Sequence, residues 1–110
     1  MKKGFKCIFA IVNNGFSEEV MVAARACGAT GGTIISGRGT MSKGAEKLFN
    51  ISIQPEKEIV MILAKAELVE GILKNLYTAV GSATQAQGIA FAMPVDEVVG
   101  IGEKPTQKEQ

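Results

Sequence analysis

A chain of 110 residues, 46% hydrophobic and 21% charged, has the composition of one globular domain with a real core. Its formal net charge of +1 gives no field that would favour nucleic acid as a partner. The absence of histidine excludes His-based catalytic triads and His metal sites, and the two cysteines have no metal-ligand spacing. The basic then apolar N-terminus is expected to be a first strand of a cytoplasmic protein rather than a secretion signal.

The first part of the chain predicts a strand, a helix and a short second strand. Residues 5–12 carry apolar side chains on both faces, as in a central strand. A helix is predicted from Ser17, a good N-cap residue, to Gly28, a residue type that commonly ends helices. The second strand, about Thr33 to Ser36, lies between two glycine-rich turns. Such turns can bring backbone N–H groups close to an anion, although glycines more often mark ordinary turns.

The rest of the chain predicts a long connection, a strand, a helix and a last strand. Residues 37–58 are interpreted as an excursion that projects from the body, since connections of this length are usually functional or mobile. Residues 59–64 are continuously apolar, as in a second buried strand. A helix over 66–80 ends at Gly81, a polar loop covers 82–88, and a fourth strand covers 89–95. The sequence from Glu103 is polar.

This order predicts an α+β, ferredoxin-like βαββαβ sandwich: a four-stranded antiparallel sheet with two helices on one face. The domain is expected to span 1–102, with the excursion at 37–58 and a polar tail at 103–110. The sheet face away from the helices would be apolar and larger than soluble monomers usually expose. We therefore predict association through this face, with cover by loops or by the tail as the alternative.

Four segments carry a resemblance to a known family. They are MKKGFKCIFAIV, SEEVMVAARACGATGGTI, KEIVMILAKAELVEGILKNL and GIAFAMPVDEVVGIGE. In this order, and over nearly the whole chain, they resemble the P-II family of nitrogen-regulatory signal-transduction proteins. The resemblance implies a homotrimer with its sheets facing inward and adenine nucleotides in clefts between neighbouring subunits. It also implies that the loop after the second strand, the T-loop, docks on a transporter, an enzyme or a regulator.

The resemblance assigns roles to individual positions. Residues 31–33 match a family segment that reads the adenine edge, and residues 38–43 match the base of the T-loop near the phosphates. Ile62 matches a strand position that lines the adenine base, and residues 87–88 match the B-loop. The implied ligand-binding residues are Gly31, Gly32, Thr33, Gly37, Arg38, Gly39, Thr40, Ser42, Lys43, Ile62, Gln87 and Gly88. The implied partner-binding residues are Lys43, Lys47, Phe49 and Ile51, although a solvated face and a hairpin packed on its own trimer would also explain them.

The sequence departs from the family at three phosphate-binding cations. The B-loop lysine is replaced by Ile89, and two strand arginines are replaced by Gly100 and Gly102. A triphosphate carries about four negative charges, which are costly to leave unpaired in a partly closed cleft. We therefore expect ADP, AMP or a cyclic adenine nucleotide to be favoured over ATP. The T-loop is also short and has no tyrosine, since Tyr77 lies on the second helix, so the chain is P-II-like rather than a nitrogen regulator proper.

Two other functions remain open. A trimeric metal-binding or metal-tolerance protein on the same scaffold would need Cys7 or Cys27 to meet its symmetry mates. A small enzyme would need a catalytic pair, but the adjacent Asp96 and Glu97 on a strand would point to opposite faces. We therefore predict a non-enzymatic sensor without a metal, whose protein partner could be a membrane transporter.

Overall fold

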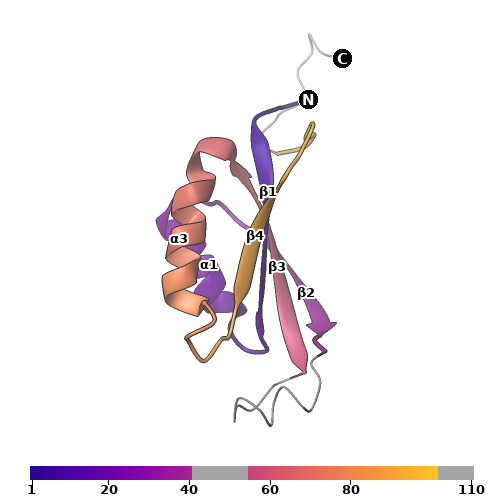
Figure 1. The fold of residues 1–110 in the computed structure, drawn as a ribbon. Coiled ribbons are helices and arrows are strands. Elements are labelled where there is room, and N and C mark those ends of the chain that lie inside the picture. Colours follow the sequence, from indigo (N-terminus) through magenta and orange to yellow (C-terminus); the bar gives the residue numbers. More distant parts are fainter. Residues whose placement is uncertain (41–54, 102–110) are drawn as a thin grey trace.

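The computed structural model describes residues 1–40 and 55–101. The elements follow in the order β1 (Phe5–Asn13), α1 (Ser17–Ala26), β2 (Thr33–Arg38), β3 (Glu56–Lys65), a 3-10 turn (Ala66–Leu68), α3 (Val69–Val80) and β4 (Ile89–Pro94). The sheet has the order β2-β3-β1-β4, and every neighbouring pair is antiparallel. Both helices lie on one side of this sheet (Figure 1). The predicted ferredoxin-like α+β fold is confirmed.

The core lies between the helices and the sheet. Alternate residues of the two central strands point toward the helices and are fully buried, because a strand directs successive side chains to opposite faces. The helices contribute residues at helical spacing, such as Ile72 and Leu76 on α3. The largest fully buried side chains are Ile8, Ile62, Ile72, Leu76, Val12, Val20 and Val60.

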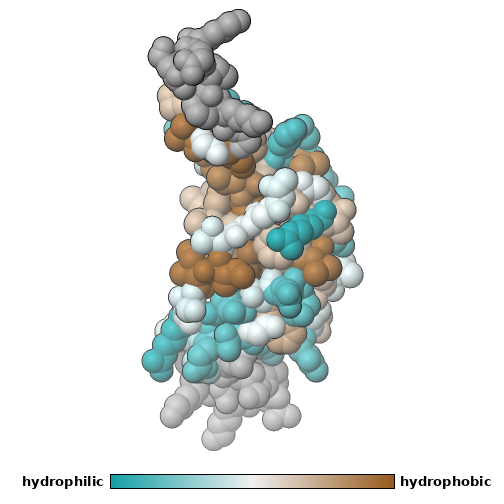
Figure 2. Space-filling view, turned by 180° about the vertical axis from the view of Figure 1, so that it is seen from behind, coloured by the Kyte–Doolittle hydropathy of each residue, from teal (hydrophilic) through white to brown (hydrophobic). Residues whose placement is uncertain are grey.

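The opposite face of the sheet, here called the open face, is apolar but is not covered by a helix (Figure 1). Its residues follow from the strand register, in which Phe9 lies opposite both Met61 and Phe91. The apolar residues of the open face are Cys7, Phe9, Ile11, Ile35, Ile59, Met61, Leu63, Ile89, Phe91 and Met93. All of these side chains are half-buried or exposed in the protomer. Seen from behind, hydrophobic surface gathers around the middle of the molecule and hydrophilic surface gathers lower down (Figure 2).

The structure confirms that the first helix begins at Ser17 but corrects how this start is capped. The N-cap position is Phe16 instead of Ser17, and the N-cap side chain makes no capping hydrogen bond. The carboxylate of Glu58 takes this role, because its Oε1 accepts hydrogen bonds from the backbone N–H of Gly15 at 2.9 Å and of Ser17 at 3.1 Å. The predicted end is confirmed: Gly28 has a φ of 104°, which suits glycine.

Three other boundaries differ from the predictions. Strand β2 continues to Arg38 and β3 begins at Glu56, so both ends of the predicted 37–58 excursion belong to a β-hairpin. The second helix starts with a 3-10 turn over 66–68. Strand β4 ends at Pro94, so Asp96 and Glu97 follow the strand instead of lying on it. Within the described ranges, no helix is long and apolar enough to cross a membrane.

Candidate functional site

Three segments that are far apart in the sequence meet at the lower end of the sheet in Figure 1, here called the loop end. They are the stem of the β2–β3 hairpin, the end of β1, and the loop 81–88 between α3 and β4. Backbone hydrogen bonds join the end of β1 to both other segments: Asn13 N–H donates to the Ala86 carbonyl at 2.9 Å, and Asn14 N–H donates to the Glu56 carbonyl of the hairpin stem at 3.1 Å. The loop 81–88 is therefore attached to the central strand of the sheet.

A polar cluster crosses this end of the molecule, here called the junction cluster and formed by Asn13, Lys57 and Gln87. The Lys57 Nζ donates to the Asn13 Oδ1 at 2.6 Å. The Asn13 Nδ2 in turn donates to the Gln85 carbonyl at 3.0 Å and to the Gln87 Oε1 at 3.3 Å. Because Asn13 is only 6% exposed, this one amide links the hairpin stem to the loop 81–88 in a partly dry environment.

The register places two members of the junction cluster, Asn13 and Lys57, on the open face. Lys57 lies opposite Asn13 on one side and opposite Gly37 on the other, in the row that continues the apolar residues of that face. Arg38 lies opposite Glu56 in the next row, which belongs to the helix-covered face. Of the described residues in the strands at the loop end, Lys57 is thus the cation on the open face.

Glycines at this end allow close approaches that other residues would block. A Cβ on Gly39 would lie 2.7 Å from the Lys57 Cε, so the lysine stem crosses the backbone of Gly39. A Cβ on Gly88 would press against the Val80 carbonyl oxygen and would lie 2.9 Å from the Val12 Cγ1. Gln87, just before it, has a φ of 48°, an unusual value for a residue with a side chain. The loop 81–88 is therefore tightly fitted against β1 and α3.

The predicted site residues in and around β2 form two groups. Gly31, Gly32 and Thr33 precede or begin β2, whereas Gly37, Arg38 and Gly39 end it or follow it. Five residue steps separate Thr33 from Arg38, or about 17 Å along a strand. The first group lines a cavity of about 570 Å³ on the open face, with Cys7, Met61, Leu63 and the segment that follows β4. One protomer therefore carries the predicted site as two separate groups.

One predicted site residue requires a correction. Ile62 has no exposed surface and lies opposite Ile8 in the core, so its side chain cannot line a cleft on the outside of the protomer. It instead packs closely against Gly32, since a Cβ on Gly32 would lie 3.1 Å from the Ile62 Cγ1. Its neighbours Met61 and Leu63 are the residues of β3 that border the cavity. The predicted residues Ser42, Lys43, Lys47, Phe49 and Ile51, and the replaced cation position Gly102, lie outside the described residues.

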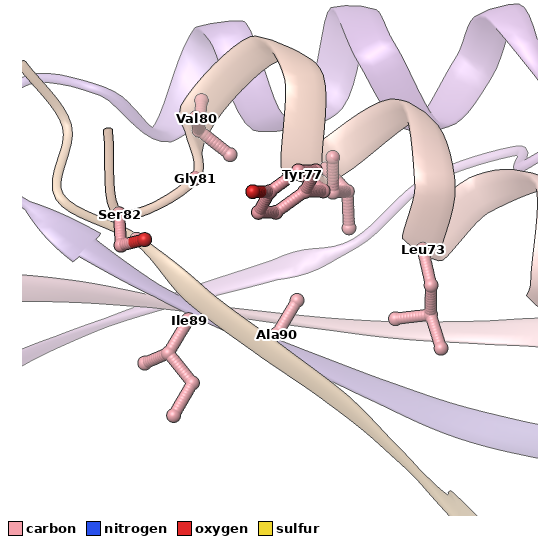
Figure 3. A pocket seen from close by; sticks show the side chains of 9 residues that line it. Leu73, Tyr77, Val80, Gly81, Ser82, Ile89 and Ala90 are labelled. Carbon is pink, nitrogen blue, oxygen red and sulfur yellow. The ribbon is translucent and has the colours of Figure 1, made fainter. Parts of the chain in front are cut away.

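A second hollow lies on the helix side of the sheet edge, between α3 and β4 (Figure 3). It has a volume of about 370 Å³ and is lined by apolar side chains such as Leu73, by the 71%-exposed Tyr77, and by the start of β4. In Figure 3 Ala90 points toward α3 and Ile89 points away from it. This groove has no cation among the described residues that line it, so it does not match the expected surroundings of a phosphate.

Sequence reasoning named Gln87 but missed Asn13 and Lys57, the other two members of the junction cluster. The signal for Lys57 was present, because the alternation of Ile59, Met61 and Leu63 on one face extends back to position 57. Nothing local indicated its contact with Asn13, which is 44 positions away. No group of three Cys, Asp or Glu side chains suited to a metal ion occurs in the part of the chain that the structure describes.

Comparisons with known proteins agree with this architecture. The family model named Nitrogen regulatory protein P-II matches residues 5–104, so the chain belongs to the P-II family. A comparison with curated proteins finds no match. The match to the family model therefore carries this assignment.

Three solved structures illustrate the shared fold. The PII protein of Arabidopsis thaliana, bound to citrate, has a TM-score of 0.67 at 20% identity, covering 97% of this chain and 90% of that chain. A PII-like signaling protein of Thermus thermophilus has a TM-score of 0.61 at 19% identity, covering 83% and 85%. A functionally unknown protein of Pediococcus pentosaceus has a TM-score of 0.65 at 15% identity, covering 91% and 100%. At these identities the likeness concerns the fold.

Proposed function

We propose that this chain is a ligand-sensing regulator that works as a homotrimer in the cytoplasm and holds an adenine nucleotide between neighbouring subunits. The observation that carries the proposal is the separation of the two groups of site residues on one protomer. Residues 31–33 and the loop-end residue Gly37 both border the open face but lie at opposite ends of β2. A cleft that uses both groups needs them from two different copies.

The open face supplies a reason for the copies to meet. Its side chains are apolar, so removing them from water favours association. Each Å² of apolar area that is buried contributes about 25 cal/mol to the free energy of association. Stable interfaces commonly bury about 800 Å² on each partner, which a four-stranded sheet can provide. Association through this face would bring the cavity of one copy next to the loop end of another.

The proposed ligand is ADP, AMP or a cyclic adenine nucleotide in preference to ATP. Ile89 and Gly100 occupy positions where the family has phosphate-binding cations, and neither can pair with an anion. The citrate in the PII protein of Arabidopsis thaliana supports the view that this fold accommodates a small anion. The candidate residues among those described are Gly31, Gly32, Thr33, Gly37, Arg38, Gly39, Thr40, Gln87 and Gly88.

The proposed output is a change in the loop between β2 and β3. A ligand at the loop end would favour one loop conformation, and a protein partner would select among conformations. Lys43, Lys47, Phe49 and Ile51 are the proposed contacts, and a membrane transporter, an enzyme or a regulator is the proposed partner. Regulation by binding needs no catalytic step, so no enzymatic activity is proposed.

One observation touches the metal-binding alternative. Cys7 lies on the open face, so association would bring copies of this thiol nearer to one another. Burial raises the pKa of the Cys7 thiol, however, which disfavours the thiolate that a metal ion would need. Metal analysis of the purified protein distinguishes the two functions, since a stoichiometric transition metal would favour the alternative.

Two measurements test the proposal. Sedimentation at micromolar concentration should give a species of three times 11.6 kDa. A thermal-shift panel should then show stabilisation by ADP, AMP or cyclic AMP, because a ligand at 100 times its Kd stabilises the native state by about 2.7 kcal/mol. A monomer, or a trimer that responds to no adenine compound, would contradict the proposal.

A further inference from the structure

We propose that Lys57 binds the anionic group of the ligand, and that its single charge selects a ligand with one phosphate over one with three. This inference rests on the proposed function, because it assumes a ligand in the cleft that the loop end borders. It goes beyond it by naming a side chain that the family resemblance does not assign and by narrowing the ligand to AMP or a cyclic mononucleotide.

The ammonium group of Lys57 is held in a fixed position. The Lys57 Nζ is held by the Asn13 Oδ1 at 2.6 Å, and the lysine stem lies across the backbone of Gly39. An ammonium has three N–H donors, so the bond to Asn13 leaves two for a ligand. Holding the side chain in place before binding lowers the entropy that a flexible lysine would otherwise lose.

The side chains around Lys57 on the open face are uncharged. Its register partners Asn13 and Gly37 are neutral. Glu56 and Glu58 are its neighbours in β3, and strand geometry directs them to the opposite face. The Glu58 carboxylate is already bonded to the start of α1. Among the described residues, the only ion pair joins Lys74 to Glu70 on α3. None of the described carboxylates therefore neutralises Lys57.

The junction cluster also links Lys57 to the loop 81–88. The Gln87 Oε1 accepts from Asn13, which leaves the Gln87 amide nitrogen as a second donor for the same anion. An anion at Lys57 would thus contact the hairpin stem directly and the loop 81–88 through the junction cluster. Binding of the anion would therefore affect both the hairpin stem and the loop 81–88.

The number of charges on the ligand decides which phosphate compound fits one lysine. A single phosphate carries one or two negative charges, close to what one lysine and nearby neutral donors can balance. A triphosphate would leave further charges unpaired where Ile89 and Gly100 have replaced cations, and an unpaired charge in a partly closed cleft is costly. The geometry of the junction cluster therefore favours the smaller anion.

Calorimetric titration of the full chain with AMP, cyclic AMP, ATP and adenosine tests this inference. Lys57→Gln should weaken binding of AMP or cyclic AMP by about tenfold or more, because a charge-assisted hydrogen bond is lost. It should leave adenosine, which has no charge, within about twofold. Lys57→Arg should retain most of the affinity, and the matched control Lys74→Gln, which changes an exposed lysine on α3, should change nothing.

A measurement on the unmodified protein keeps the test independent of folding defects. Affinity for the single-phosphate ligand should fall as salt is raised, whereas affinity for adenosine should not. Unchanged affinity in Lys57→Gln, an equal loss for adenosine, or an absent salt effect would each overturn the inference while the proposed function stands. ATP bound more tightly than AMP and cyclic AMP would overturn the inference together with the proposed preference for less charged nucleotides, and would leave the proposed role as an adenine-nucleotide sensor. Failure of the unmodified protein to bind ADP or any of the four compounds would overturn both together.

Discussion

The rings of Phe9 and Phe91 stack on the open face, with centroids 5.5 Å apart and planes 20° from parallel. The two residues are direct partners across β1 and β4. Such a pair contributes about 0.5–1.5 kcal/mol beyond the area it buries. Phe91 nevertheless remains 40% exposed, so the stack also offers a flat aromatic surface to a second copy.

We predict that Phe91→Asp converts the proposed trimer to monomers. A carboxylate at the centre of an apolar interface would lose its hydration without gaining a partner, which disfavours association strongly. Sedimentation velocity at micromolar concentration measures the change. The control is Val22→Asp on α1, a residue that is 65% exposed and lies on the helical layer. Association that survives Phe91→Asp and fails in Val22→Asp would place the interface on the helices instead.

Cys7 gives a second, chemical view of the same face. Burial raises the pKa of its thiol, so at any pH near neutral the reactive thiolate fraction is smaller than in a free cysteine. We expect slow alkylation by iodoacetamide near neutral pH that accelerates as the pH rises, followed by mass spectrometry of the modified peptide. Association should slow the reaction further, so Cys7 should react faster in Phe91→Asp than in the unmodified protein. Equal rates in both would argue that this thiol is not covered.

The raised pKa also fixes the sign of a stability effect. The unfolded chain releases the Cys7 proton at the ordinary thiol pKa, before the folded chain does. The contribution of Cys7 to the free energy of unfolding is therefore complete below that value and declines as the pH rises through it. Cys7→Ser should remove this alkaline decline in denaturant titrations.

The elements could be predicted because their signals are local. Apolar side chains on both faces identified β1, and glycines marked the end of α1 and the limits of the loop 81–88. The open face could be anticipated because β1 and β3 are apolar on both sides while both helices cover one side. The face to which Ile62 points could not be anticipated, since an apolar residue in such a strand fits either side equally well.

The candidate site was only partly predictable for a related reason. The contact between Lys57 and Asn13 spans 44 positions, and the contact between Asn13 and Gln87 spans 74. Both depend on the register between strands, which no short sequence window contains. The same holds for Glu58, whose role at the start of α1 replaced the one expected for Ser17.

We predict that Glu58→Gln destabilises the protein by about 1 kcal/mol. The carboxylate accepts from Gly15 and Ser17 at the start of a helix, where negative charge is favoured. An amide keeps one acceptor but loses the charge. The matched control Glu56→Gln alters an exposed carboxylate in the same strand and should change the midpoint of urea unfolding very little. Equal midpoints for the two variants would show that the cap contributes nothing.

Two glycine substitutions should have opposite effects on stability. Gly88→Ala should lower the free energy of unfolding by roughly 1–3 kcal/mol, because its Cβ would press against the Val80 carbonyl and the Val12 side chain. Gly71→Ala, on an exposed turn of α3 with no atom within 4 Å of the new Cβ, should raise it by about 0.5–1 kcal/mol through helix propensity. Urea unfolding of the two variants beside the unmodified protein measures both signs. An unchanged midpoint for Gly88→Ala would mean that the loop 81–88 can move away from β1, and the junction cluster would then not be a fixed support for Lys57.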